Sequence, residues 1–210
     1  MLQYLLIPVT SFQQNCSLVW CDQTNEAVLV DPGGEVERLL SAVAERQLDL
    51  KAIWLTHGHL DHVGATAELK KTLNLPVTGP HKDDLFLLDA IPKQVERFGF
   101  APVDSFLPDQ WLDEGDALKV GNEVLSILHT PGHTPGHVVL KHDKQKILWV
   151  GDVLFKHSVG RTDFPRGNHA ELIVSIKNKL LVLDDDYRFI PGHGPESTIG
   201  EERAHNPFLI

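Results

Sequence analysis

Three imidazoles and one carboxylate occur within one short segment of this chain. It follows the apolar run 52–55 and reads Thr56-His57-Gly58-His59-Leu60-Asp61-His62. Imidazole nitrogens and carboxylate oxygens are the usual ligands of zinc and similar divalent ions. Gly58 permits a tight turn, so that His57 and His59 can point to one side and Asp61 and His62 to another. One loop is therefore expected to serve two metals.

Three more candidate ligands follow apolar runs and stand beside Gly or Pro. They are His133, Asp152 and His193. His133 is central in a turn held by two prolines and two glycines, and a His between two glycines, as at 193, has little packing role. The seven ligands divide into His57, His59 and His133 for one metal and Asp61, His62 and His193 for the second, with Asp152 bridging.

Such an arrangement is typical of a catalytic centre, because each metal keeps an open position. Two metals roughly 3.5 Å apart hold a bridging hydroxide, since coordination lowers the pKa of water to about 7. We expect this metal-bound hydroxide to be the nucleophile, with Asp61 and Asp152 as the catalytic carboxylates. The expected cofactors are two divalent metal ions. Zinc is the expected metal, and iron and manganese are the alternatives.

The remaining candidates have less decisive surroundings. Asp31 ends a predicted strand and either orients a ligand His or forms part of a turn. His137 is expected to be buried or to support a ligand, with direct ligation as the alternative, and His129 is expected to be structural. The other histidines are expected to be exposed or to cap helices: His81, His142, His157, His169 and His205.

Composition narrows the function classes. With 210 residues and 42% hydrophobic content, one domain with a sizeable core is expected. A net charge of −10 argues against binding to nucleic acid. Two cysteines, Cys16 and Cys21, are expected to be buried or inert thiols in a reducing, cytoplasmic setting. The apolar start, 1–8, is too short to span a bilayer, so no membrane is expected as a partner.

Hydrophobic periodicity predicts the elements that must position the ligands. Helices are expected at 35–47, 63–73, 81–98 with a break or kink at Pro92, and 169–181 with Asn168 as N-cap. Strands are expected at 2–9, 16–20, 26–30, 51–55, 76–78, 117–120, 123–129, 138–141, 146–150 and 187–190. Two strand-rich halves, each with helices, predict an α/β fold of two stacked sheets with helices outside, a four-layer αββα sandwich.

These motifs, over nearly the whole chain, resemble those of the metallo-β-lactamase superfamily. Segments 131–137, 151–152, 160–164 and 191–194 are most similar to its glyoxalase II branch, in particular the short bacterial type called YcbL or GloC. The resemblance implies the same ligand division. It also implies hydrolysis of a small-molecule glutathione thioester, S-lactoylglutathione, to D-lactate and glutathione in methylglyoxal detoxification. The oligomeric state is not indicated.

One departure concerns glutathione binding. Longer glyoxalase II proteins have a helical C-terminal region that contacts glutathione, whereas only a short segment follows His193 here. Residues 1–210 are therefore expected to form one hydrolase domain without a separate C-terminal glutathione-binding domain. Arg161 and Arg166 are the candidate substrate residues, and an Arg161–Asp163 pair is the alternative interpretation of Arg161.

Two other functions compete with this interpretation. A persulfide dioxygenase also resembles the chain, including motif 160–164, but it uses one iron held by two His and one Asp. Asp61, His62 and His193 would then lie outside the metal's coordination sphere. A non-enzymatic metal-binding protein is less expected, because seven ligands around two ions leave vacancies. β-Lactam and phosphodiester substrates are further alternatives within the superfamily.

Overall fold

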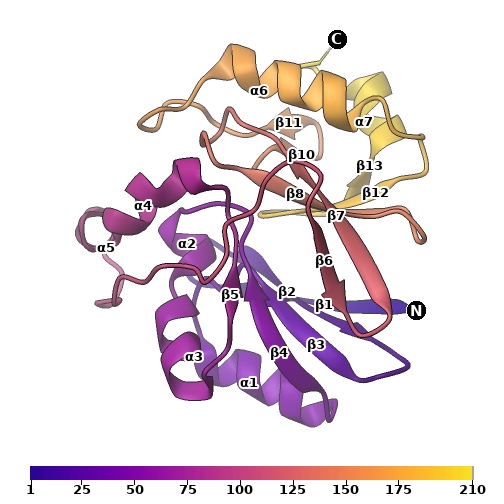
Figure 1. Ribbon diagram of the computed structural model, residues 1–210. Coiled ribbons are helices and arrows are strands. Elements are labelled where there is room, and N and C mark those ends of the chain that lie inside the picture. The colour runs from indigo at the N-terminus through magenta and orange to yellow at the C-terminus, as the bar shows by residue number, and fades with distance from the viewer. Residues whose placement is uncertain (210) are drawn as a thin grey trace.

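Neighbouring residues of strand β9 (Ile147–Gly151) face opposite sides of one sheet. Trp149 lies in an apolar cluster between the two sheets, and Leu148 lies in a second cluster between this sheet and helix α6 (His169–Ser175). A third cluster fills the space between the first sheet and its helices. Side chains alternate along a strand, so a sheet covered on both faces must be apolar on both. Three clusters separate four layers, which confirms the predicted αββα sandwich (Figure 1).

The computed structural model describes residues 1–209, so Ile210, the last residue of the predicted 1–210 domain, lies outside the described residues. The first sheet has the order β1-β2-β3-β4-β5. Its strands are β1 Leu2–Val9, β2 Gln14–Cys21, β3 Glu26–Val30, β4 Asp49–Trp54 and β5 Val77–Thr78. The second has the order β13-β12-β9-β8-β7-β6. Its other strands are β6 Ala117–Val120, β7 Glu123–His129, β8 Val138–His142, β12 Arg188–Pro191 and β13 Ser197–Thr198.

The helices cover the outer faces of the two sheets (Figure 1). Those of the first half are α1 Val36–Glu45, α2 Leu60–Val63, α3 Thr66–Leu73, the 3₁₀ turn Lys82–Asp84, α4 Leu85–Asp89 and α5 Ile91–Phe98. In the second half, α6 continues into the π-helical turn Ile176–Leu180, and α7 spans Ile199–His205. A small hairpin joins β10 (Leu154–Phe155) to β11 (Ser158–Val159). Among the helices of residues 1–209, none has both the length and the apolar character needed to cross a bilayer.

Parallel strand pairs bring the functional loops to one edge. β3 runs parallel to β4, and β9 runs parallel to β12. β7 and β9 both run antiparallel to β8, so they share a direction. The carboxyl ends of β4, β7, β9 and β12 are followed by the segment 57–62, His133, Asp152 and His193, respectively. The topology therefore gathers residues from both halves of the chain.

Several predicted helices are divided in the structure. The predicted helix 63–73 begins earlier, as α2, and is interrupted at Gly64 before α3. A side chain at Gly64 would collide with the carbonyl oxygen of Gly33, at 2.4 Å. The predicted helix 81–98 breaks at Ala90, and Pro92 lies in the first turn of α5, where its missing N–H costs no hydrogen bond. Asn168 caps α6 as predicted, accepting a bond from the Glu171 N–H.

One prediction about a histidine is wrong. His142 is neither exposed nor a cap: it is buried, with its Nε2 3.0 Å from Oε2 of Glu123. Glu123 begins β7 beside it and is also buried, so it gives His142 Nε2 a hydrogen-bond partner inside the sheet; His142 Nδ1 has none among the described residues. His157, His169 and His205 are exposed, as expected. Cys16 and Cys21 are buried free thiols, also as expected.

Alanine at Gly132 should destabilise the protein more than alanine at a glycine that also has a positive φ but has open space around it. Its φ is +141°, and an added Cβ would lie 2.3 Å from backbone atoms of Leu172 in α6. Gly115, with φ +86°, has open space around it. We expect Gly132→Ala to lower the free energy of unfolding by about 3 kcal/mol or more and Gly115→Ala by about 1 kcal/mol. Urea denaturation of both variants measures this; equal losses would contradict the packing argument.

Candidate metal centre

Three imidazoles converge on one point at the sheet edge. The Nε2 of His57 is 3.1 Å from Nδ1 of His59, which is 2.9 Å from Nε2 of His133. His57 and His133 are buried, and His59 is half-buried. In a tetrahedral zinc site, nitrogens about 2.0–2.1 Å from the metal lie roughly 3.3 Å apart. The three nitrogens therefore have the spacing of ligands to one ion.

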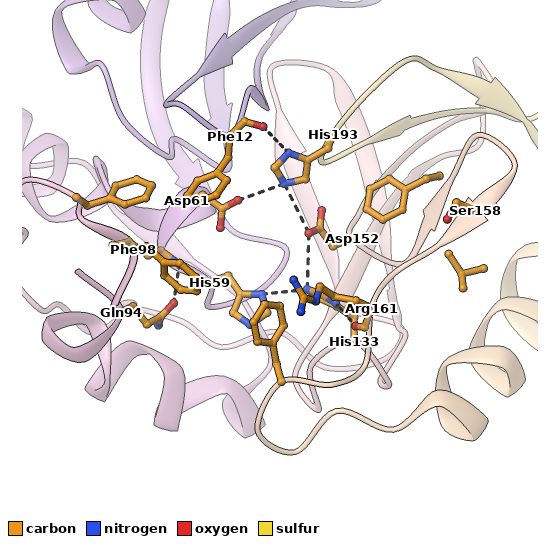
Figure 2. A pocket seen from close by; sticks show the side chains of 15 residues that line it. Phe12, His59, Asp61, Gln94, Phe98, His133, Asp152, Ser158, Arg161 and His193 are labelled. Carbon is orange, nitrogen blue, oxygen red and sulfur yellow. Dashed lines mark hydrogen bonds and ion pairs between the residues drawn. The ribbon is translucent and has the colours of Figure 1, made fainter. Parts of the chain in front are cut away.

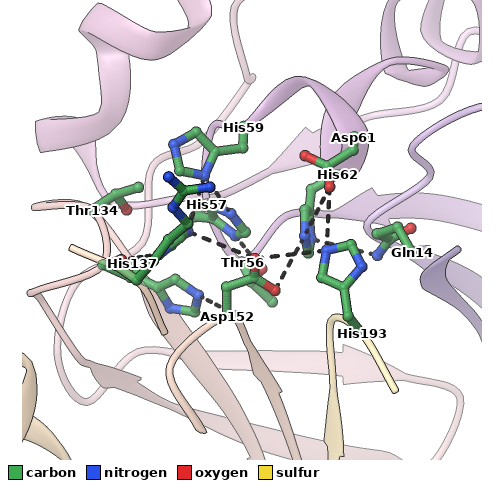
Figure 3. A network of polar contacts seen from close by, with 12 residues as sticks. Gln14, Thr56, His57, His59, Asp61, His62, Thr134, His137, Asp152 and His193 are labelled. Atoms are coloured by element: carbon green, nitrogen blue, oxygen red, sulfur yellow. Dashed lines mark hydrogen bonds and ion pairs between the residues drawn. The ribbon is translucent and has the colours of Figure 1, made fainter. Parts of the chain in front are cut away.

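A second cluster lies beside the first (Figure 3). The Nε2 of His193 is 3.2 Å from Oδ2 of Asp61, and that oxygen is 4.0 Å from Nε2 of His62. Asp152 stands between the clusters: its Oδ1 is 3.4 Å from His62 Nε2, and its Oδ2 is 3.7 Å from Nε2 of both His133 and His193. All seven predicted ligands thus meet in one place, with Asp152 facing both groups.

Two unpaired buried atoms test whether this donor set fits metal ions. His62 Nε2 and Asp152 Oδ1 are buried and lack a hydrogen-bond partner among the described residues. A buried polar group without a partner costs free energy, so such groups usually bind something. Imidazole and carboxylate suit zinc, iron and manganese. The chain therefore fits two divalent ions, one at each cluster.

Asp31 orients part of this centre. Its Oδ2 accepts a bond from His62 Nδ1 at 2.9 Å and from the Thr56 hydroxyl at 2.6 Å, and its Oδ1 accepts from the Thr56 N–H at 2.7 Å. Because the Thr56 hydrogen is donated to Asp31, its oxygen can accept from His57 Nδ1, 3.1 Å away. Each imidazole then presents Nε2 to the centre. Of the two interpretations of Asp31, the orienting role is the one that the contacts support.

The other two histidines that present Nε2 to the centre are oriented by backbone carbonyls. His133 Nδ1 donates to the Arg161 carbonyl at 2.7 Å, and His193 Nδ1 donates to the Phe12 carbonyl at 3.1 Å. Carbonyl oxygens accept only, so both rings keep Nε2 free for a metal. His137 is buried, and its Nε2 accepts the Asp152 N–H at 3.1 Å, so of the two interpretations the supporting role is the one that the contacts favour.

Asp84, which no sequence motif indicates, ties two ligand loops together. Its carboxylate accepts bonds from the Gly58 N–H at 2.9 Å, the Gly136 N–H at 2.6 Å and the Thr134 hydroxyl at 2.8 Å. Gly58 separates His57 from His59, and Thr134 follows His133. Burial raises the pKa of Asp84 to about 6, although these three donors favour the charged form. Asp84 therefore holds the two loops that carry the first imidazole cluster in fixed positions relative to one another.

The protonation states of the two clusters differ. Burial lowers the pKa of His59 to about 3, and it lowers the pKa of His57 and His133 as well. Burial would also lower the pKa of His62, but Asp152 and Asp31 outweigh it and raise that pKa well above the usual value. Asp61 likewise raises the pKa of His193 against the effect of burial. The first cluster is thus ready for a metal at pH 7, whereas the second must release protons.

The two clusters form the floor of an open cleft of about 370 Å³ (Figure 2). Five phenylalanines contribute to its walls: Phe12, Phe98, Phe100, Phe155 and Phe164. Arg161 also lines the cleft, but its Nε and Nη2 bind Asp163 at 2.7 and 2.6 Å, the alternative interpretation of this residue. Arg166 lies over the Phe86 ring and donates to the Asp83 carbonyl; it is not among the described residues that line the cleft.

Comparison with known proteins agrees with this geometry. The family model described as the metallo-β-lactamase superfamily matches residues 9–193. The chain belongs to that superfamily. The match runs from the end of β1 to His193, so it includes every loop of the metal centre.

Similar members of the superfamily cover nearly the whole chain. A protein of Haemophilus influenzae, hydroxyacylglutathione hydrolase GloC, is 51% identical over 97% of this chain and 96% of its own length. The crystal structure of TTHA1623 in a di-iron-bound form has a TM-score of 0.89 at 40% identity, covering 98% of this chain and 100% of that one. The B3 metallo-β-lactamase BLEG-1 also has a TM-score of 0.89, at 39% identity, covering 100% and 99%.

Lower pH should empty the second cluster first. His62 and His193 have raised pKa values and must lose protons to bind metal, whereas the histidines of the first cluster are already neutral. We expect zinc-loaded protein dialysed at pH 8 to keep about two metals per chain and the same protein at pH 6 to approach one. Elemental analysis after dialysis measures this ratio. The variants His57→Ala and His193→Ala each remove a ligand of one cluster, so they show which cluster loses its metal. Equal loss of metal from both clusters would contradict the assignment.

Asp84→Ala should loosen the first cluster without touching a ligand. Three buried donors would lose their acceptor, which should lower the free energy of unfolding by at least about 2 kcal/mol. Asp83→Ala is the matched control, because Asp83 is exposed and should change stability by less than about 0.5 kcal/mol. Denaturant titration and metal analysis of both variants test this; a metal affinity unchanged in Asp84→Ala would contradict the positioning role.

Proposed function

We propose that this protein is a two-metal thioester hydrolase that cleaves S-lactoylglutathione to D-lactate and glutathione, as part of methylglyoxal detoxification. The carrying observation is the convergence of two ligand clusters around Asp152 at the floor of an open cleft. The 51% identity to hydroxyacylglutathione hydrolase GloC, over nearly the full length of both chains, supports the glutathione thioester as substrate. Two buried free thiols favour a reducing, cytoplasmic location.

In this proposal His57, His59 and His133 hold one ion, and Asp61, His62 and His193 hold the other, with Asp152 shared. When bound, two such ions supply an activated water and positive charge that stabilises a developing oxyanion. Zinc is the expected metal; the di-iron form of TTHA1623 makes iron the main alternative. The carboxylates of Asp61 and Asp152 face the cleft, where they can orient the attacking water by accepting its hydrogen bonds.

The reaction needs little else from the protein. The water gives one proton to bulk solvent as its oxygen forms a bond to the thioester carbonyl carbon. The C–S bond then breaks, the sulfur leaves with the electron pair as a thiolate, and the carboxylic acid that forms loses its proton to solvent. A thiol pKa of about 8.5 makes the thiolate a good leaving group, so a dedicated general acid is not required. This suits a cleft whose carboxylates, Asp61 and Asp152, are both assigned to the metals.

Metal content and S-lactoylglutathione hydrolysis, measured on one preparation, test the proposal. Two metals per chain with rapid thioester hydrolysis is the expected result. One iron per chain, with oxygen uptake on glutathione persulfide and no thioester hydrolysis, would instead indicate the persulfide dioxygenase. In that case Asp61, His62 and His193 would be dispensable, and alanine at these positions would leave activity intact.

Asp152→Ala should lose metal and abolish thioester hydrolysis, because the carboxylate faces both clusters and would be a ligand of both ions. We expect kcat to fall by at least about 10³-fold. Elemental analysis accompanies the rate measurement, so that loss of metal and loss of chemistry are seen separately. Full activity in this variant would refute the bridging role. Asp163→Ala, at an exposed carboxylate outside both clusters, is the control for metal content.

A further inference from the structure

The cleft presents aromatic rings where a glutathione site would be expected to present cations. Of its fifteen lining residues, five are phenylalanines. Arg161 is the single Lys or Arg among the described lining residues. Asp163 binds its Nε–Nη2 edge through two bonds, and the Phe164 ring covers one face of the guanidinium, 4.4 Å away. Glutathione carries two carboxylates at neutral pH, and the described lining residues offer no unpaired Lys or Arg to bind them.

One wall of the cleft is a continuous aromatic surface. Phe12 stacks on Phe100 with ring centres 5.6 Å apart, and it meets Phe98 edge-on at 6.0 Å. Phe12 comes from the turn after β1, whereas Phe98 and Phe100 come from the end of α5 and the residues after it. The wall is therefore built from two separate segments that meet beside Asp61 and His59 (Figure 2).

The exposure of this wall indicates which part of a substrate would meet it. Phe12 and Phe98 are 44% and 39% exposed, so they form the lip of the cleft. A thioester carbonyl at the metal ligands leaves a short acyl group, such as lactoyl, near the floor. The thiol side is the longer arm, and it can extend from the floor toward the lip formed by Phe12 and Phe98. Exposed aromatic rings at that place favour an apolar group, because burying them against one removes apolar surface from water.

We propose that the Phe12–Phe98–Phe100 wall binds an apolar thiol arm of the thioester, so that uncharged, aromatic thiols are accepted at least as well as glutathione. This inference rests on the proposed thioester hydrolysis and names the substrate class within it. Glutathione thioesters remain substrates, held through the reacting thioester and the cysteinyl part rather than through the glutathione carboxylates.

Three lactoyl thioesters that differ only in the thiol test the inference: those of glutathione, N-acetylcysteamine and 2-phenylethanethiol. For the wild-type enzyme we expect kcat/KM for the phenylethyl thioester to equal or exceed that for the glutathione thioester. It should also exceed that for N-acetylcysteamine by about tenfold. Phe12→Ala and Phe98→Ala should each lower the phenylethyl value at least about fivefold more than the N-acetylcysteamine value.

Phe208→Ala is the matched control, because Phe208 is 51% exposed and does not line the cleft; it should leave all three rates unchanged. Phe98 is not one of the seven ligands, so its variant separates wall effects from effects on the metal centre, which elemental analysis checks.

A glutathione thioester preferred more than about tenfold over both neutral thioesters would overturn the inference but leave the proposed function standing. Equal losses on all three substrates in the two wall variants would overturn it too. Absence of hydrolysis with every thioester would overturn both.

Discussion

Asp152 places a negative charge at a largely buried position on the cleft floor, between the imidazoles of His62, His133 and His193. Burial raises the free energy of a carboxylate strongly unless positive charge or hydrogen-bond donors surround it. Those three imidazoles keep the pKa of Asp152 low despite its burial. The fold therefore has to deliver three histidines from three separate strand ends to one carboxylate, and much of the surrounding chain serves that requirement.

Close approach of the backbone makes this delivery possible. A side chain at Gly192 would lie 2.1 Å from Asp152 Oδ1, and one at Gly160 would lie 1.9 Å from the Asp152 carbonyl oxygen. These two glycines let loops of the second half of the chain approach Asp152 closely. Behind them, Asp31 and Asp84 hold the segment 56–62 from two sides. The ligands are thus oriented by fixed bonds on both sides, as a rigid catalytic site requires.

The sequence was enough to predict the four-layer architecture and the groups that meet at the sheet edge. Strands buried on both faces appear as short apolar runs bounded by turn residues, which locates them in the chain. A His held between Gly and Pro contributes little to packing, which favours a ligand role. Asp84 could not be found in this way, since Lys82-Asp83-Asp84 has the composition of an ordinary polar turn and its partners lie far along the chain. The burial of His142 could not be predicted either, because strand pairing places its partner, Glu123, beside it. The aromatic wall also depends on tertiary contacts between distant segments.

Phe12 has two roles that belong to different functions of the molecule. Its ring forms part of the cleft wall, and its carbonyl oxygen accepts the His193 Nδ1 hydrogen. Any change in the β1–β2 turn that reshapes the wall also shifts the group that aims His193. If the proposed roles hold, thiol selectivity and metal retention are coupled through this one residue. Relatives of this protein would be expected to vary the α5 side of the cleft more freely than the β1–β2 turn, because only that turn both lines the cleft and orients His193.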